Sequence, residues 1–222
     1  MILIIRGHIR NSFENKNLYN LIKLIYEKYT DVKIYIHTWN IFSNDISWRK
    51  ININNNIVNE KIIYDYFNDL SHLIKHIIID DDSKIRLIGK TTGFVSKSLM
   101  PTIGWKNYWY GKFKILSYIY YNKIDKNEMI VNFRFDINMN SNNIDNNCIM
   151  NFIKENNKLI FTKNVFLKDR IMGVDNIYIG NIIIMYKLTH TFFYRLDDII
   201  RKHRNIVCQE QLVCIINDKI FG

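Results

Sequence analysis

Arg134, Asp136 and Asn138 stand at alternate positions in the segment Arg134-Phe135-Asp136-Ile137-Asn138. In extended backbone, alternate side chains point to one face, so a cation, a carboxylate and an amide oxygen would lie together. Carboxylate and amide oxygens are ligands for hard divalent cations, and a guanidinium binds phosphate oxygens. The spacing favours a diphosphate site, with Asp136 and Asn138 on a divalent metal (Mn²⁺ or Mg²⁺) and Arg134 on phosphate. An internal Arg134–Asp136 ion pair is the alternative.

The segment Arg6-Gly7-His8-Ile9-Arg10 follows an unbroken apolar run, Ile2 to Ile5. Glycine directly after a buried strand lets the backbone turn tightly and approach a ligand. Arg6 and Arg10 beside it could hold a diphosphate through their planar guanidinium groups. An ordinary strand-to-helix turn with solvated arginines is the alternative. Because the chain has neither G-x-G-x-x-G nor a Walker A lysine here, a dinucleotide-cofactor protein and an ATPase are disfavoured.

Two further polar groups follow predicted strands. His37-Thr38-Trp39 offers an imidazole, a hydroxyl and an indole, and Trp39 would either stack on a base or, more commonly, pack in a core. Asp80-Asp81-Asp82 offers carboxylates for a metal. Three successive carboxylates on an extended strand cannot converge on one ion, so an acidic loop start is the commoner explanation.

The elements that carry these groups alternate between strand and helix. Ser12 is expected to cap the first helix, and apolar residues at helical spacing then predict helices between short apolar strands. The result is an α/β fold with a mainly parallel central sheet flanked by helices. In such sheets ligands bind beyond the carboxyl ends of the strands. The predicted strands are Ile2–Ile5, Val32–His37, Ile77–Ile79 and Met129–Phe133, and the predicted helices are Leu18–Tyr29, Asn59–His76 and Trp105–Tyr121.

Beyond Asp136 the pattern becomes irregular and more helical. The asparagine clusters at 54–56 and 142–147 are interpreted as loops, since asparagine tolerates turn conformations. Later elements are predicted as a strand at 159–162, a short segment at 178–181 and short helices at 183–188, 192–202 and 209–217. Because no linker rich in proline, glycine or serine interrupts the chain, residues 1–222 are expected to form one domain.

Composition narrows the class of protein. The chain has 222 residues, 48% of them hydrophobic, and a net charge of +10 without a run of four basic residues. It can therefore build a core, and its charge permits an anionic ligand, although an AT-rich genome explains part of the lysine excess.

Three cysteines without a CxxC pair argue against a disulfide framework or zinc site. No apolar run reaches the ~20 residues that span a bilayer, and the N-terminal run is too short for a signal peptide. A cytoplasmic protein, soluble or peripheral to a membrane, is expected, in the host cytoplasm if it is viral.

In this order, the motifs resemble those of GT-A-like glycosyltransferases of polysaccharide and lipopolysaccharide synthesis. That group includes WavE-type and capsule-type proteins and related enzymes of large DNA viruses. The segments that carry the resemblance are Arg6–Arg10 (small-Gly-x-x-Arg), Val32–Trp39 (a strand ending H-x-W), Trp105–Ile119 (an aromatic-rich helix), Val131–Asp136 (R-x-R-x-D, with Asn132 for the first arginine), Asp175–Asn181 (D-x-x-x-x-G-S/N) and Gln209–Leu212 (P-E-x-x, with Gln209 for proline).

The resemblance implies a nucleotide-sugar donor and a glycan or lipid-linked acceptor. It places Asp136 on the metal and the two late acids, Asp175 and Glu210, on the acceptor side as catalytic residues. It also implies a nucleotide-binding half at about 1–138 and an acceptor-side half at about 139–222. The usual D-x-D metal motif ends here in Asn138, which argues for weak metal binding. The residues implied at the donor are Arg6, Gly7, Arg10, His37, Thr38, Trp39 and Arg134.

Two other functions remain open on the sequence alone. Net charge and the aromatic residues of Trp105 to Lys114 would suit a nucleic-acid-binding module, but no RRM, KH or zinc signature is present, so nucleic acid is the less favoured partner. Asn138 in place of an acid also leaves open a catalytically degenerate transferase fold that serves only in binding.

Overall fold

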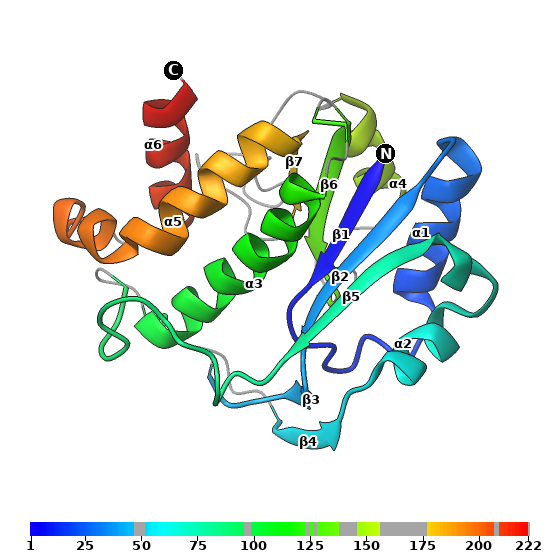
Figure 1. The fold of residues 1–222 in the computed structure, drawn as a ribbon, viewed down its shortest axis with the longest axis horizontal. Coiled ribbons are helices and arrows are strands. Elements are labelled where there is room, and N and C mark those ends of the chain that lie inside the picture. Colours follow the sequence, from blue (N-terminus) through cyan, green and yellow to red (C-terminus); the bar gives the residue numbers. More distant parts are fainter. Residues whose placement is uncertain are drawn as a thin grey trace.

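A five-stranded sheet in the order β5-β2-β1-β6-β7 forms the centre of the molecule (Figure 1). The computed structural model describes residues 1–46, 52–95, 99–122, 125–126, 128–137, 146–155, 177–206 and 209–221. The first four strands in this order run parallel and β7 is antiparallel to β6. The predicted α/β fold with a mainly parallel sheet is therefore confirmed. The strands are β1 (Ile2–Arg6), β2 (Lys33–Trp39), β5 (Ile74–Asp80), β6 (Met129–Arg134) and β7 (Ile177–Asn181).

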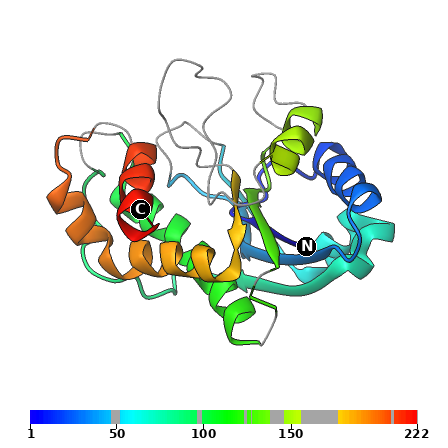
Figure 2. The ribbon, with the colours of Figure 1, turned by 90° about the horizontal axis from the view of Figure 1, so that it is seen from above.

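Helices cover both faces of the sheet (Figure 2). Every residue of β1 is buried, because Leu3 and Ile5 contact one helical layer while Ile2 and Ile4 contact the other. This two-sided burial explains why β1 is an unbroken apolar run. The first layer contains α1 (Asn17–Lys28), α2 (Glu60–Phe67), the 3₁₀ helix η1 (Asn68–Leu73) and α4 (Asn146–Glu155), and the second contains α3 (Thr102–Tyr121), α5 (Ile182–Lys202) and α6 (Gln209–Phe221).

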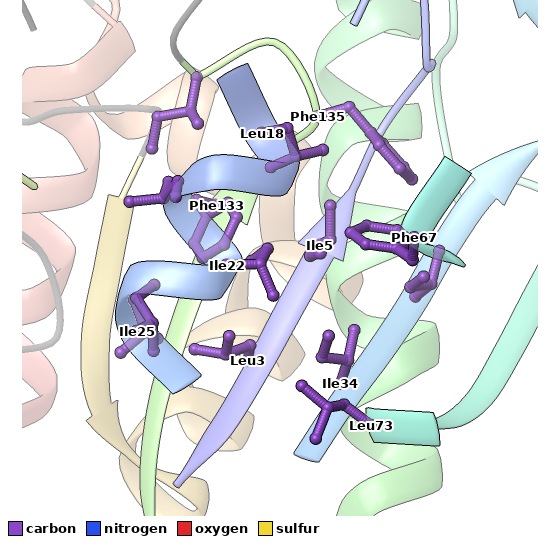
Figure 3. Packing of buried hydrophobic residues seen from close by; sticks show 14 of the residues in the cluster. Leu3, Ile5, Leu18, Ile22, Ile25, Ile34, Phe67, Leu73, Phe133 and Phe135 are labelled. Carbon is purple, nitrogen blue, oxygen red and sulfur yellow. The ribbon is translucent and has the colours of Figure 1, made fainter. Parts of the chain in front are cut away.

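Helix α1 packs its apolar stripe on the sheet (Figure 3). Leu18, Leu21, Ile22 and Ile25 recur at helical spacing and are all buried, as predicted. The expected N-cap at Ser12 is wrong, because the helix begins at Asn17 and Ser12 lies in a turn in which its amide donates to the Ile9 carbonyl. Among the described residues, the buried Ser12 hydroxyl has no hydrogen-bond partner.

The helix predicted over 59–76 is divided in the structure. Asn59 caps α2 by accepting a hydrogen bond from the Ile62 amide at 3.0 Å. Asn68 adopts a left-handed conformation (φ 47°), which ends α2 at Phe67 and starts the 3₁₀ helix. Strand β5 consequently begins at Ile74 rather than Ile77.

Other differences concern asparagine-rich and C-terminal segments. Asn54–Ile57 forms strand β4, which pairs with β3 (Ile41–Ser43) in a small antiparallel sheet, although a loop was predicted. Helix α4 was also not predicted, yet it buries Ile149, Met150 and Ile153. The two helices predicted at 183–188 and 192–202 form one helix, α5, with non-helical backbone at Arg195. The predicted strand 159–162 lies outside the described residues.

No helix in the described part of the chain is long and apolar enough to cross a membrane.

The carboxylate of Asp197 holds segment 83–95 against both α3 and α5. Asp197 of α5 forms an ion pair with the buried Lys106 of α3 (Oδ1–Nζ 2.7 Å) and accepts a hydrogen bond from the Lys90 amide at 2.8 Å. Lys106 also donates to the Ile88 carbonyl. Gly89 has φ +73°, and a Cβ there would collide with the Asp197 carboxylate, so only glycine fits this contact.

Asp197→Ala is expected to loosen segment 83–95 without unfolding the rest of the protein. Because Asp197 is 43% exposed and Lys106 is buried, loss of this pair should cost at least about 1 kcal/mol. Trypsin cleavage after Arg86 or Lys90 should then become at least about fivefold faster, where the segment opens and closes faster than it is cut. Limited proteolysis under native conditions measures this rate. Asp198→Ala is the matched control, since the Asp198 carboxylate pairs only with exposed Arg201 among its described contacts. Equal cleavage rates in the two variants would contradict the assignment.

Candidate functional site

The carboxyl ends of β1 and β6 meet at the point where the order of the strands reverses. From β1 the chain proceeds to β2 and β5 on one side, and then crosses back to β6 on the other. Open α/β sheets bind ligands in the crevice at such a switch point. Arg6 and Arg134 are register partners at the ends of these two strands. The structure therefore brings together the two segments that carried the sharpest sequence signals.

The turn after β1 has an unusual backbone. Gly7 has φ 96°, and its amide donates to the His37 carbonyl at 3.1 Å. Arg10 is also left-handed (φ 53°), a conformation that is uncommon for residues with a Cβ and that clusters at functional sites. The Arg10 amide donates to the Phe42 carbonyl at 2.8 Å, which holds the turn in place. This conformation lets Arg10 reach across to the end of β6.

Arg10 and Arg134 converge on the carboxylate of Asp136. Asp136 Oδ2 lies 2.7 Å from Arg10 Nη1 and 2.5 Å from Arg134 Nη2. Asp136 is 8% exposed, whereas the side chains of both arginines are more accessible. Burial by itself would raise the pKa of Asp136, but the charges and hydrogen bonds of Arg134 and Arg10 outweigh it and lower that pKa.

The internal ion pair predicted as an alternative is present, with Arg10 as an additional partner. The assumption of one extended face for Arg134, Asp136 and Asn138 is wrong, because β6 ends at Arg134 and residues 135–137 form a turn. Asn138 lies outside the described residues.

A divalent metal does not fit Asp136 in this arrangement. Both guanidinium groups contact the same oxygen, so a metal bound there would lie next to two cations. Among the residues that the structure describes, no group of three His, Cys, Asp or Glu side chains could hold a metal ion. The metal therefore stays a prediction from the sequence, and no chemistry is assigned through it.

Arg6 is directed under the site rather than into it. It is 3% exposed, its Nε donates to Asn132 Oδ1 at 2.8 Å, and its guanidinium lies 4.4 Å from the centre of the Tyr108 ring. Asn132, which stands where the related motif has an arginine, thus supports Arg6. Arg6 contributes positive charge close to the β1–β6 crevice while being held by residues of the second helical layer.

A second buried cation, Lys112 of α3, was missed in the sequence. It is 1% exposed, its Nζ donates to the Tyr108 hydroxyl at 2.6 Å, and it lies 3.3 Å from the centre of the Tyr178 ring. The signal that could have found it is positional: Lys112 occupies a place in the buried stripe formed by Trp105, Trp109 and Leu116. A charged residue in such a stripe usually has a specific environment.

The end of β2 forms a polar cluster with β5 and α3. Fully buried His37 contacts Asp80 (Nε2–Oδ2 3.2 Å), and the Tyr110 hydroxyl donates to the same oxygen at 3.0 Å. Burial lowers the pKa of His37 despite the nearby Asp80. The hydrogen bond from His37 is the main cause of the lowered pKa of Asp80. The cluster thus combines a neutral imidazole with an ionised carboxylate.

The other β2 residues predicted at the donor have internal contacts. The Thr38 hydroxyl donates to the Gly7 carbonyl at 2.9 Å, which supports the turn after β1. Trp39 is buried and stacks with Tyr110 at a ring separation of 6.0 Å. Of the two roles considered for Trp39, packing in the core is therefore the one that fits. Thr38 and Trp39 support the site through internal contacts. The His8 ring lies against Trp39. Its pKa is lowered to about 3, mainly because the ring is buried.

The three acids at the end of β5 face different partners, as the sequence argument anticipated. Asp80 contacts His37, Asp81 pairs with Lys84 and accepts from the Ser83 hydroxyl, and Asp82 accepts from the Asn44 side chain. They do not converge on one ion.

The predicted catalytic acids cannot be placed beside this site. Asp175 lies outside the described residues. Glu210 falls in the first turn of α6, and its side chain is also outside the described part of the chain.

Two of the four aromatic residues proposed for nucleic-acid stacking are core residues. Trp105 and Trp109 are buried, and Trp109 stacks on Phe192 of α5 at 4.0 Å. They do not offer ring faces to a ligand.

Comparison of the sequence with models of known protein families and with curated protein sequences gives no match.

Proposed function

We propose that the protein is a GT-A-like glycosyltransferase that binds a nucleotide-diphosphate sugar across the carboxyl ends of β1 and β6. The observation that carries this proposal is the convergence of Arg10 and Arg134 on one carboxylate at the topological switch point. A guanidinium has five N–H donors, so a side chain oriented by Asp136 can still donate to phosphate oxygens. The mainly parallel sheet is compatible with a GT-A-like fold.

The proposed reaction is displacement of a nucleoside diphosphate from the sugar. An acceptor hydroxyl oxygen forms a bond to the anomeric carbon, and the bond from that carbon to the diphosphate oxygen breaks. The nucleoside diphosphate leaves with the electron pair, and the hydroxyl proton passes to a base, for which the resemblance implies Asp175 or Glu210. Arg10 and Arg134 would stabilise the charge that develops on the leaving diphosphate.

Asp136 has a positioning role in this proposal. Its buried carboxylate draws the two guanidinium groups together before the ligand arrives, which reduces the entropy lost on binding. The buried cations Arg6 and Lys112 add positive potential behind the crevice.

Arg134→Ala is expected to weaken binding of a nucleotide sugar about tenfold, the effect of removing one charge-assisted hydrogen-bonding group. Isothermal titration calorimetry with UDP- and GDP-sugars, each with and without Mn²⁺, measures the affinity. Arg201→Ala is the matched control, because Arg201 is an exposed arginine on α5 that pairs with Asp198. Unchanged affinity in Arg134→Ala, or no binding of any donor by the wild type, would overturn the proposal.

A further inference from the structure

Helices α3 and α5 lie side by side on one face of the sheet and present a shared outer surface (Figures 1 and 2). Aromatic rings from both helices cover this surface. Tyr121 is 69% exposed and Tyr194 is 48% exposed, and the rings between them are partly accessible. We call this surface the aromatic face, and it consists of Phe113, Tyr120, Tyr121, Tyr186, His190, Phe193 and Tyr194.

The rings of the aromatic face contact one another in a continuous series. Phe113 stacks on Phe193 at 4.5 Å, and Tyr120 stacks on Tyr186 at 4.2 Å. The Tyr121 and Tyr186 hydroxyls lie 3.0 Å apart. Many ring faces are thus occupied by other rings, while ring edges and phenol hydroxyls remain at the surface.

The charged side chains within the aromatic stretches of α3 and α5 are all basic, and the acids Asp125 and Asp198 follow these stretches in the sequence. Residues 102–121 of α3 and 182–196 of α5 contain no aspartate or glutamate. Their exposed charged side chains are Lys114, Lys187 and Arg195, and Lys126 lies 4.6 Å from the Tyr120 ring. The opposite helical layer differs, since α1 and α2 carry Glu27, Glu60 and Asp65 among their lysines. The aromatic stretches of α3 and α5 are therefore basic and contain no acids, unlike helices α1 and α2 of the opposite layer.

We infer that the aromatic face docks on an anionic lipid bilayer. Tyrosine suits the membrane interface because its ring is apolar and its hydroxyl reaches the headgroups. Lysine and arginine beside it attract anionic headgroups and extend their charges toward them. Two adjacent helical surfaces of this composition match an interfacial element that lies on a membrane without crossing it.

The ring geometry favours lipid over nucleic acid. Stacking of bases requires exposed ring faces, whereas four rings of the aromatic face already have one face covered in the Phe113–Phe193 and Tyr120–Tyr186 stacks. Insertion among headgroups and acyl chains needs only ring edges and hydroxyls. The inference does not depend on the proposed glycosyl transfer, because it concerns the outer surface of α3 and α5 rather than the β1–β6 crevice.

Sedimentation with lipid vesicles tests the inference on the full chain. The wild type is expected to bind vesicles that contain phosphatidylserine, to bind phosphatidylcholine vesicles much less, and to dissociate as salt is raised. The double variant Tyr194→Ser/Lys114→Ala should bind the anionic vesicles at least about fivefold more weakly, the effect of one cation removed from the interface.

The matched control is Tyr26→Ser/Lys23→Ala on α1, which removes a comparably exposed tyrosine and lysine from the opposite layer. It should bind like the wild type, and circular dichroism checks that both variants are folded. Equal weakening in both variants, or no preference for anionic vesicles, would overturn the inference. A single-stranded oligonucleotide that binds the wild type and competes with the vesicles would overturn it as well and assign the surface to nucleic acid.

Discussion

Asp136→Asn is expected to lower the free energy of unfolding by about 3 kcal/mol, because removal of one partner from a buried ion pair leaves its counter-charge uncompensated. Here two guanidinium groups, those of Arg10 and Arg134, depend on the same carboxylate oxygen. The amide of asparagine can accept a hydrogen bond, but it does not neutralise either cation. Urea denaturation at neutral pH, followed by tryptophan fluorescence, measures the change.

Asp65→Asn provides the control for this substitution. Asp65 forms an exposed i,i+4 pair with Lys61 on α2 (Oδ2–Nζ 2.6 Å). Exposed pairs of this kind contribute about 0.5 kcal/mol or less. A comparably small effect of Asp136→Asn would mean that the carboxylate does not hold the two arginines together in solution.

The pH dependence of the same variant gives a second measurement. The pKa of Asp136 is lowered in the folded protein, so its ionised form stabilises the fold above the unfolded value of 3.8 and this contribution is lost as the pH falls through the lower, folded value. The gap in stability between wild type and Asp136→Asn should therefore be constant near neutral pH and shrink below 3.8. Buried His37 is present in both proteins, so its acid destabilisation cancels in the difference. The charge of Asp136 acts on the pKa of His8, which is about 3, so the two proteins are compared above that pH. A gap that persists unchanged in acid would contradict the ion-pair assignment.

Manganese distinguishes the ion pair from a metal site in these experiments. If Asp136 acts only on Arg10 and Arg134, Mn²⁺ or a chelator will leave the unfolding curve of the wild type unchanged. If Mn²⁺ stabilises the wild type and not Asp136→Asn, the carboxylate is a metal ligand, since a ligand that binds only the folded state raises its stability.

The parts of the fold that were predicted from the sequence are those specified by local periodicity. The run Ile2–Ile5 and the stripe from Leu18 to Ile25 are local signals, and β1 and α1 follow them. Strand β4 has no such signal, because Asn54–Ile57 is held by backbone pairing with β3 rather than by a buried face. The end of α2 was missed because it depends on the left-handed conformation of Asn68.

Only the part of the candidate site that depends on local spacing was predicted from the sequence. Arg134 and Asp136 are close in the sequence, so their pairing was one of the two interpretations considered. Arg10 joins them only because β1 and β6 are neighbours in the sheet and because Arg10 adopts a left-handed φ. Neither condition is visible in a local pattern. The burial of Lys112 could be read from its place in the stripe of α3, but its contact with Tyr178 of β7 could not.

Gly111→Ala is expected to destabilise the protein by about 2 kcal/mol, the usual cost of overpacking a core. In an ordinary helix, the same substitution would stabilise by up to about 1 kcal/mol. At Gly111 of α3, however, a new Cβ would lie 2.7 Å from His37 Nδ1. The His37 ring is fully buried and held by Asp80, so it cannot move aside without breaking that contact. Thermal and urea unfolding measure the change.

Gly104→Ala and a double-mutant cycle separate this collision from a general effect of alanine in α3. A Cβ at Gly104 would lie 3.0 Å from the terminal methyl group of Met100 and 3.3 Å from Ile46 Cγ2. The flexible Met100 side chain can give way and Ile46 needs to shift only slightly, so a smaller cost than at Gly111 is expected. In a His37→Ala background, Gly111→Ala should lose its cost or become stabilising, because the ring that it strikes is gone. If Gly111→Ala costs the same with and without the His37 ring, the strain lies elsewhere in α3. If the cost disappears, close approach of α3 to the end of β2 is the reason that glycine occupies position 111, and the His37–Asp80–Tyr110 cluster depends on it.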